Sequence, residues 1–152
     1  SLAPDVNSKA KGVYFGFTLK HTRAHFVRAI LEAIGYIIRR NIDALANMGI
    51  DVTEIRSLGG GSKSAVWNQI KADITGKTLI TVDCEESACL GAAVLAGKAI
   101  GMFPDIEMAC QEMINEKERF EPNPENQAVY DRGYEHYKKL FKDLESMFET
   151  AY

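Results

Sequence analysis

The amino-acid sequence predicts a helix-rich α/β domain whose sheet is incomplete. Apolar residues recur with helical spacing over several long segments, and two short β-rich segments, residues 53–58 and 77–82, alternate with them. Strands that alternate with helices form parallel sheets. Because two strands make a poor sheet by themselves, we expect the sheet to be completed by strands from elsewhere, or by self-association through its open edge.

The first predicted helix extends from residue 22 to about residue 48. Thr22 is a residue type that caps helix N-termini, and Gly49 follows the last turn, where glycine enters the left-handed region at little cost. Large apolar side chains recur between these ends at helical spacing: Phe26, Ile30, Ile34, Ile37, Ile38, Ile42 and Leu45. Small residues widen this apolar face, so we expect the helix to be largely buried.

A short strand is predicted at residues 53–58, followed directly by three glycines and a second helix. We expect Ser62 to cap this helix and Gly76 to end it. Its inner face is predicted to consist of Trp67, Ile70 and Ile74. The next strand, residues 77–82, is short and rich in β-forming residues.

A third helix is predicted over residues 84–100. Asp83 and Glu86 have the spacing of a capping box at its start. The segment is rich in alanine and glycine, whose small side chains let a helix approach its neighbour closely, so we expect tight packing here. A short helix should follow from Pro104 to about Met113.

The polar residues 115–124 are predicted to form a surface crossing before a last long helix. Asn123 can cap that helix, and Pro124 suits its first position. The helix should run towards Glu149 with an aromatic-rich stripe that packs on the domain, although a helix that binds a partner is the alternative.

Composition narrows the classes of function. The chain has 152 residues, a net charge of −3 and a pI near 5.6, which argues against a nucleic-acid surface. An apolar run of about 18 residues, as a membrane span needs, is absent. Three sparse cysteines, Cys84, Cys89 and Cys110, predict reduced thiols and no zinc site. With no signal peptide visible at the start of the chain, we expect a cytoplasmic protein.

The junction between residues 54 and 69 is the segment with a functional signal. Glycines bring backbone N–H groups close to a ligand, and the start of the following helix offers free N–H groups and a positive dipole end, which together suit a phosphate. The alternative is that Gly59, Gly60 and Gly61 only form a tight turn between strand and helix. The spacing matches neither the P-loop nor the dinucleotide-binding fingerprint.

Three segments of the chain are similar to one known family. The segment GGGSKSAVWNQIKADITG, residues 59–76, resembles the GGG-x-x-S-x-x-W-x-Q-x-x-A-D-x-x-G signature of FGGY carbohydrate kinases. The segments GFTLKHTRAHFVRAILE, residues 16–32, and EESACLGAAVLA, residues 85–96, resemble the same family in order and spacing. Within the family, the xylulose kinase group is the most similar.

The resemblance implies an actin-like ATPase fold, in which two RNase H-like domains enclose a cleft. It also implies transfer of the γ-phosphate of ATP to a sugar hydroxyl, assisted by Mg²⁺, with D-xylulose or a related pentulose as the acceptor. Glycerol, gluconate and ribulose are the alternative acceptors. A nucleotide-binding module without catalysis and a purely structural α/β domain are the alternatives outside the enzymes.

The resemblance also assigns roles to individual residues. Gly59, Gly60 and Gly61 match the loop that lies against the adenosine and α-phosphate end of ATP. Ser64 falls where the family often places a polar contact near adenine, and Asn68 is its neighbour in the nucleotide site. Asp73 occupies a motif position that we interpret as structural.

The family's catalytic Asp, its sugar-binding domain and the first strands of this sheet precede the segment that the chain resembles. Residues 1–152 are therefore expected to be the C-terminal, nucleotide-binding portion of a sugar kinase. We expect no catalytic residue and no metal ligand in this portion, and no turnover from it alone. Because its sheet would be incomplete, we also expect a homo-oligomer.

Overall fold

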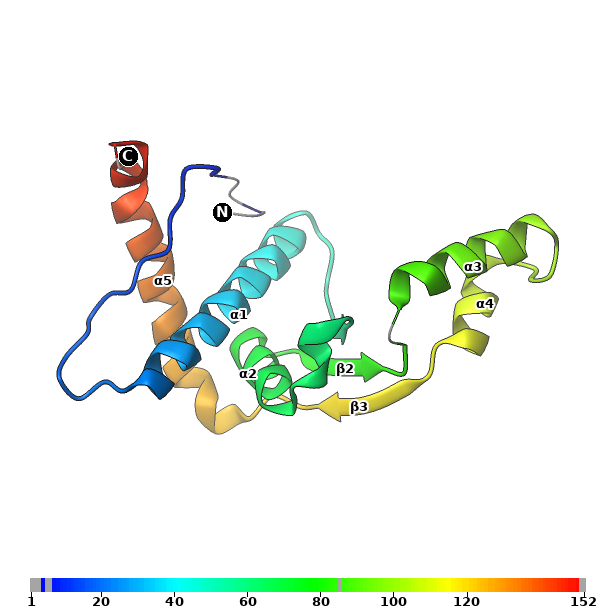
Figure 1. The fold of residues 1–152 in the computed structure, drawn as a ribbon, viewed down its shortest axis with the longest axis horizontal. Helices are drawn as coiled ribbons and strands as arrows, with labels where there is room; N and C mark the ends of the chain where they lie inside the picture. The colour runs from blue at the N-terminus through cyan, green and yellow to red at the C-terminus, as the bar shows by residue number, and fades with distance from the viewer. Residues whose placement is uncertain (1–3, 5–6, 85, 151–152) are drawn as a thin grey trace.

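The computed structural model describes residues 4, 7–84 and 86–150, which form helices around one small sheet (Figure 1). The sheet has the order β1-β2-β3, with β1 parallel to β2 and β2 antiparallel to β3. In chain order the elements are α1 (Arg23–Asn47), β1 (Glu54–Ser57), the 3₁₀ turn η1 (Gly60–Lys63), α2 (Ala65–Thr75), β2 (Thr78–Val82), α3 (Ser87–Ala99), α4 (Ile106–Met113), β3 (Glu116–Phe120) and α5 (Pro124–Thr150).

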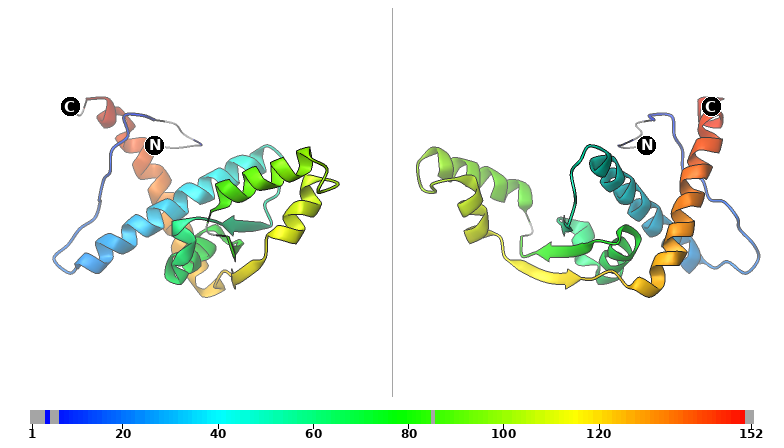
Figure 2. Two further views of the ribbon diagram at one scale, coloured as in Figure 1. Left: turned by 45° about the vertical axis from the view of Figure 1, so that its right-hand side comes forward. Right: turned by 180° about the vertical axis from the view of Figure 1, so that it is seen from behind.

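The core lies where α2 packs on α1 and α5. Ile70, Ile74 and Tyr130 are buried there, and the half-buried Leu31 and Trp67 pack against them. Helices α3 and α4 lie at the opposite end of the molecule from α1 and α5 (Figures 1 and 2). In the part of the chain that the structure describes, no helix is both long and apolar enough to cross a membrane.

The bounds of α1 were predicted correctly, but its burial was not. The helix begins after Thr22, whose backbone N–H donates to His25 Nδ1 at 3.1 Å, and it ends before Gly49, which has φ 82°. Only Gly35 of α1 is buried, and Phe26 and Ile30 are exposed. The apolar face of α1 is wider than the surface of α2 and α5 that covers it.

The predicted surface crossing is exposed as expected, but its residues 116–120 form a strand, β3, which the sequence did not predict. Four of these five residues are charged, and the pattern lacks the apolar alternation of a strand. Backbone pairing decides the conformation: Leu79 lies opposite Phe120, and Ile80 lies opposite Arg119. The strand closes one edge of the sheet, whereas β1 forms the other edge.

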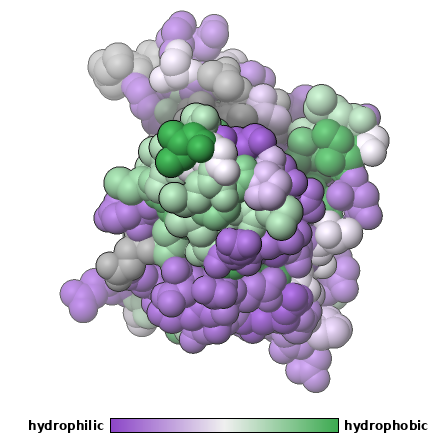
Figure 3. Space-filling view, turned by 90° about the vertical axis from the view of Figure 1, so that its right-hand side faces the viewer, coloured by the Kyte–Doolittle hydropathy of each residue, from purple (hydrophilic) through white to green (hydrophobic). Residues whose placement is uncertain are grey.

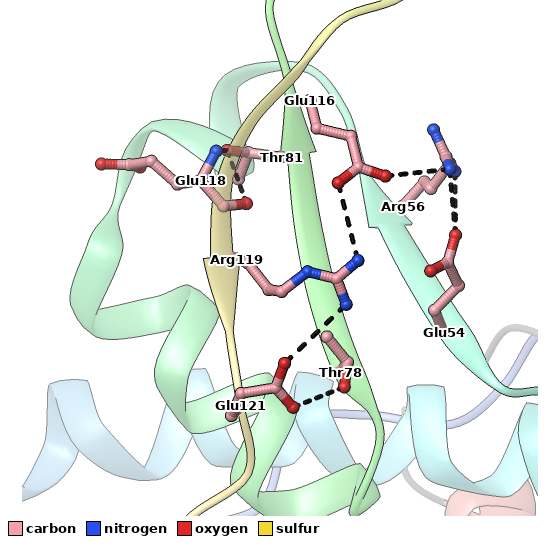
Figure 4. Close-up of polar contacts among 8 residues, drawn as sticks. All are labelled: Glu54, Arg56, Thr78, Thr81, Glu116, Glu118, Arg119 and Glu121. Carbon is pink, nitrogen blue, oxygen red and sulfur yellow. Dashed lines mark hydrogen bonds and ion pairs between the residues drawn. The ribbon is translucent and has the colours of Figure 1, made fainter. Parts of the chain in front are cut away.

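A network of charged side chains covers the face of the sheet that points away from α2 (Figure 4). Arg56 on β1 pairs with Glu54 at 3.0 Å and with Glu116 at 3.3 Å. Arg119 on β3 pairs with Glu116 at 3.6 Å and with Glu121 at 3.8 Å. Exposed ion pairs of this kind contribute about 0–1 kcal/mol each to stability, so this face of the sheet is a polar surface in contact with solvent.

The prediction for α3 needs two corrections. The helix begins at Ser87 instead of Cys84, and the backbone N–H of Asp83 donates to Asn115 O, so Asp83 continues the sheet and does not cap the helix. Only Val94 and Gly97 of α3 are buried, and a Cβ at Gly97 would lie 2.8 Å from Phe103. The remaining alanines and glycines of α3 are exposed, and apolar residues form a patch on this end of the molecule above a band of hydrophilic residues (Figure 3).

The last two helices follow the sequence signals closely. Asp105 Oδ1 accepts from Met108 N at 2.8 Å and caps α4. Asn123 Oδ1 accepts from Glu125 N at 3.0 Å at the start of α5. The aromatic stripe of α5 packs on the domain through three buried side chains, Tyr130, Tyr134 and Phe148, and the Tyr134 hydroxyl donates to Asp43 at 2.6 Å.

Candidate functional site

The glycine segment forms a sharp turn between β1 and α2. Gly59 has φ 73° and ψ −164°, a conformation that is essentially confined to glycine. Residues Gly60–Lys63 then form one 3₁₀ turn, and α2 begins at Ala65. The turn requires glycine at its first position, which is a structural reason for at least one of the three glycines.

Hydrogen bonds within the turn fix its shape. Ser62 Oγ donates to Gly59 O at 2.7 Å, and Asn68 Nδ2 donates to Ser62 O at 2.7 Å. The predicted cap is therefore wrong: Ser62 closes the 3₁₀ turn, and Ser64 caps α2 by accepting from Trp67 N at 3.3 Å. The two serines are only two positions apart, and the 3₁₀ turn that precedes α2 determines that Ser64 is the cap.

Gly60 and Gly61 have different surroundings. A Cβ on Gly60 would meet no atom within 4 Å, whereas a Cβ on Gly61 would lie 2.9 Å from Trp67 Cζ3. Trp67 is held in turn by α1, because its Nε1 donates to Leu31 O at 3.3 Å. The backbone is therefore open to an approaching ligand at Gly60 and packed against the protein at Gly61.

The predicted site residues fall into two groups. Gly59, Gly60, Gly61 and Ser64 all lie between β1 and the start of α2, and Ser64 is exposed. Asn68 is 0% exposed, and among the residues that the structure describes its Oδ1 has no hydrogen-bond partner. Its side chain supports the turn from the protein side, so a direct contact with a ligand stays a prediction.

Lys71 is a member of this region that the sequence reasoning missed. Its side chain is 6% exposed, and its Nζ donates to Ser57 Oγ, at the end of β1, at 3.0 Å. Nζ also lies 4.9 Å from the centre of the Trp67 ring. Burial lowers the pKa of the Lys71 ammonium group because desolvation disfavours its charged form.

Asp73 on α2 has structural partners. Asp73 is buried, and its two oxygens accept from Gln69 Nε2 at 2.8 Å, Asn123 N at 2.9 Å and Asn126 Nδ2 at 2.8 Å. It thereby joins α2 to the start of α5, which confirms its structural interpretation. Among the described residues, no three His, Cys, Asp or Glu side chains lie together as a metal site would require.

The turn has the chemistry of an anion site. The first N–H groups of a helix lack partners within the helix, and the dipole of α2 places partial positive charge at its start. A glycine with free space above it lets a phosphate approach the backbone. These features place the chain in the class of α/β domains with a glycine-rich turn between a strand and a helix.

The chain belongs to the FGGY family of carbohydrate kinases, and its residues 1–100 match the C-terminal domain of that family. The xylulose kinase of Staphylococcus epidermidis is 34% identical over 144 residues, which cover 95% of this chain and 29% of that protein. A glycerol kinase of Oceanobacillus iheyensis is 39% identical over 115 residues, which cover 75% of this chain and 23% of that protein.

The solved structures agree with this assignment. The crystal structure of the xylulose kinase from Rhodospirillum rubrum superposes with a TM-score of 0.82 at 28% identity, over 92% of this chain and 28% of that one. The ligand-bound xylulose kinase from Lactobacillus acidophilus gives a TM-score of 0.85 at 26% identity, over 97% of this chain and 30% of that one.

These findings confirm the family resemblance and the predicted fold class. The chain is a helix-rich part of an actin-like ATPase fold. It spans 29% of the length of the Staphylococcus relative that it matches.

Proposed function

We propose that this chain is the C-terminal, nucleotide-binding portion of an ATP-dependent sugar kinase. The acceptor would be D-xylulose or a related pentulose, and the chain would supply the adenosine side of the ATP site. The observation that carries this proposal is the turn at Gly59–Gly61, whose backbone is open at Gly60 and fixed on the protein side by Ser62 and Asn68.

The residues of the turn would divide the work of binding. Gly60 would let the α-phosphate end of ATP approach the N–H groups at the start of α2, and Ser64 would offer its hydroxyl near the adenine. Asn68 would hold the turn in shape through Ser62. Bound ATP would supply the phosphoryl group, and Mg²⁺, held mostly by residues outside this chain, would neutralise the charge that develops during its transfer.

The catalytic base and the sugar site would lie outside this chain. Asp73, the carboxylate of the family signature, already has structural partners. The identity of the sugar would therefore be set elsewhere. A glycerol kinase is the second candidate, because the Oceanobacillus relative is 39% identical. The remaining alternatives are a kinase that acts on gluconate or ribulose, and a nucleotide-binding module without catalysis.

We further propose that the protein is cytoplasmic and forms homo-oligomers.

A chimera tests this proposal directly. The chain would replace the matching segment of the Staphylococcus epidermidis xylulose kinase, and ADP release would be followed with Mg-ATP and xylulose, ribulose, glycerol or gluconate. We expect turnover with xylulose, a large loss of turnover in a Gly60→Val chimera, and no loss in a Gly12→Val chimera. Gly12 is a matched control because a Cβ there also meets no atom within 4 Å.

Two outcomes would contradict the proposal. Absence of turnover from a folded chimera, with ATP still bound by the 152-residue chain, would favour the non-catalytic module. Absence of ATP binding as well would leave the glycine segment as a structural turn only.

A further inference from the structure

We propose that Lys71 is a positioning residue of the ATP site, which holds the glycine turn from both flanks through Ser57 and Trp67. The inference rests on the proposed function, because a positioning residue needs a nucleotide to position. It adds a residue that the family signature does not specify, since Lys71 lies at one of the two variable positions between the Gln and the Ala of that signature.

The first link joins Lys71 to the strand that enters the turn. Its Nζ donates to Ser57 Oγ at 3.0 Å. Ser57 is the last residue of β1, and only Leu58 separates it from Gly59, whose φ of 73° begins the turn. The end of β1 is therefore fastened to α2 by a side chain that lies 14 residues further along the chain.

The second link joins Lys71 to the other flank of the turn. Residues four apart lie on the same face of a helix, and Lys71 Nζ lies over the Trp67 ring, 4.9 Å from its centre. A cation in this place is attracted by the ring. The same ring lies against Gly61, where a Cβ would meet Cζ3 at 2.9 Å. Lys71 therefore restrains the ring on which the last glycine of the turn packs.

The burial of Lys71 indicates a role other than stability. Lysine is almost never fully buried unless it is paired, and Lys71 is 6% exposed. Among the described residues its partners are a hydroxyl group and an aromatic ring, neither of which carries a net charge. The cost of removing the ammonium group from water is therefore offset only in part. An apolar side chain of similar length would avoid this cost but would lose both links.

Two fixed flanks determine where Gly60 lies between them. A Cβ on Gly60 would meet no atom within 4 Å, so this residue is not held by packing above it. The bonds of Ser62 and Asn68 hold the second half of the turn, whereas Lys71 holds the end of β1 and the Trp67 ring. Its positive charge at the end of β1 also adds to the dipole of α2 in favouring an anion at the turn.

The chimera with the Staphylococcus epidermidis xylulose kinase tests this role. Initial rates of xylulose phosphorylation would be measured at varied Mg-ATP for the wild type, Lys71→Met, Lys71→Arg and Lys139→Met. We expect Lys71→Met to raise the KM for ATP about fivefold or more, and to change kcat and the KM for xylulose by less than about twofold, because the lost interactions serve ATP binding equally in the ground and transition states.

Two variants separate positioning of the turn from general effects. Arginine can donate to a hydroxyl group and lie over a tryptophan ring, so Lys71→Arg should keep the KM for ATP within about twofold of the wild-type value. Lys139 is exposed and pairs with Asp143 on α5. Lys139→Met therefore removes a positive charge away from the turn and should leave kcat and both KM values unchanged.

Ser57→Ala tests the link to β1 without changing residue 71. If Lys71 acts in part through Ser57, the double variant Ser57→Ala/Lys71→Met should raise the KM for ATP by less than the product of the two single increases. Single increases that simply multiply would contradict this link. The urea midpoint of the 152-residue chain would be measured for each variant, and we expect no lower midpoint for Lys71→Met.

The outcomes separate this inference from the proposed function. In an active chimera, a KM for ATP that Lys71→Met leaves unchanged would overturn the inference alone. A lower urea midpoint with a loss of kcat at unchanged KM would also overturn it, because Lys71 would then be a structural residue. A wild-type chimera without turnover would contradict the proposed kinase activity. Calorimetric titration of the 152-residue chain with Mg-ATP would then decide the inference: weaker binding by Lys71→Met supports it, and equal or absent binding overturns it.

Discussion

Replacement of Gly61 by alanine should destabilise the protein through one identifiable contact. The new Cβ would lie 2.9 Å from Trp67 Cζ3, 3.5 Å from Cε3 and 3.6 Å from Cη2, whereas carbon atoms pack best at about 3.5–4.0 Å. The ring has little freedom to move because its Nε1 is bonded to Leu31 O. Overpacking of this kind costs about 1–3 kcal/mol.

Gly60→Ala is the matched control for this prediction. Alanine also stabilises a protein by about 0.4–1 kcal/mol, because it restricts the unfolded chain. This contribution is shared by the two variants and cancels when they are compared. Since a Cβ on Gly60 meets no atom within 4 Å, the difference in unfolding free energy between the variants should be about 1–3 kcal/mol.

Urea unfolding gives this difference, with circular dichroism for the helices and fluorescence for the turn. Trp67 is the single tryptophan of the chain, so its emission reports on the ring that Gly61 contacts. We expect the Gly61→Ala midpoint to fall below that of Gly60→Ala, with a shifted emission maximum in the folded state. Equal midpoints and equal spectra would refute the proposed packing of the turn on Trp67.

Three further predictions follow from the same structure. Asp73→Ala should lower the unfolding free energy by about 2–4 kcal/mol, because three half-buried hydrogen bonds to its carboxylate are lost; an unchanged urea midpoint would contradict its structural role. Gly133→Ala should cost about 1–3 kcal/mol, because its Cβ would overlap the Tyr36 hydroxyl, and the cost should fall in a Tyr36→Phe background; equal costs in both backgrounds would refute the contact. Burial raises the pKa of Tyr36 to about 12, so the unfolded chain loses this proton first. The unfolding free energy should therefore fall as pH rises from about 10 to about 12. It should fall by less in the Tyr36→Phe variant, and identical pH profiles of the two proteins would argue against this cause.

The sequence predicted local structure well where the signals were local. The bounds of α1 follow from Thr22 and Gly49, and the start of α5 follows from Asn123 and Pro124, since caps act within a few residues. The choice of Ser62 as the cap of α2 was wrong because a 3₁₀ turn intervenes. That 3₁₀ turn is held by a hydrogen bond from Asn68, in the first turn of α2, to Ser62 O.

Non-local pairing accounts for the other differences. Nothing in the residues of β3 predicts a strand except Phe120, and the segment is a strand because β2 lies beside it. The burial of α1 and α3 was overestimated. An apolar helix face indicates that another element can pack against it, but not that such an element is present. Lys71 was missed because its partner, Ser57, is on another element.

The candidate site could be predicted as a segment but not as a geometry. The glycine signature located the turn, and the family resemblance that it supported is confirmed. The distinction between an open Gly60 and a packed Gly61 depends on where the Trp67 ring lies. A pattern of three identical residues could not have revealed this difference.

Nucleotide binding by the 152-residue chain tests the central claim most directly. Mg-ATP would be titrated calorimetrically into the wild-type chain, Gly60→Val and Gly12→Val, with the urea midpoint of each variant measured in parallel. We predict saturable binding that Gly60→Val weakens at least tenfold and that Gly12→Val leaves unchanged, with neither variant unfolding at a lower urea concentration than the wild type. Absence of binding by the folded wild-type chain, or binding that Gly60→Val leaves intact, would contradict the assignment of the glycine turn to ATP.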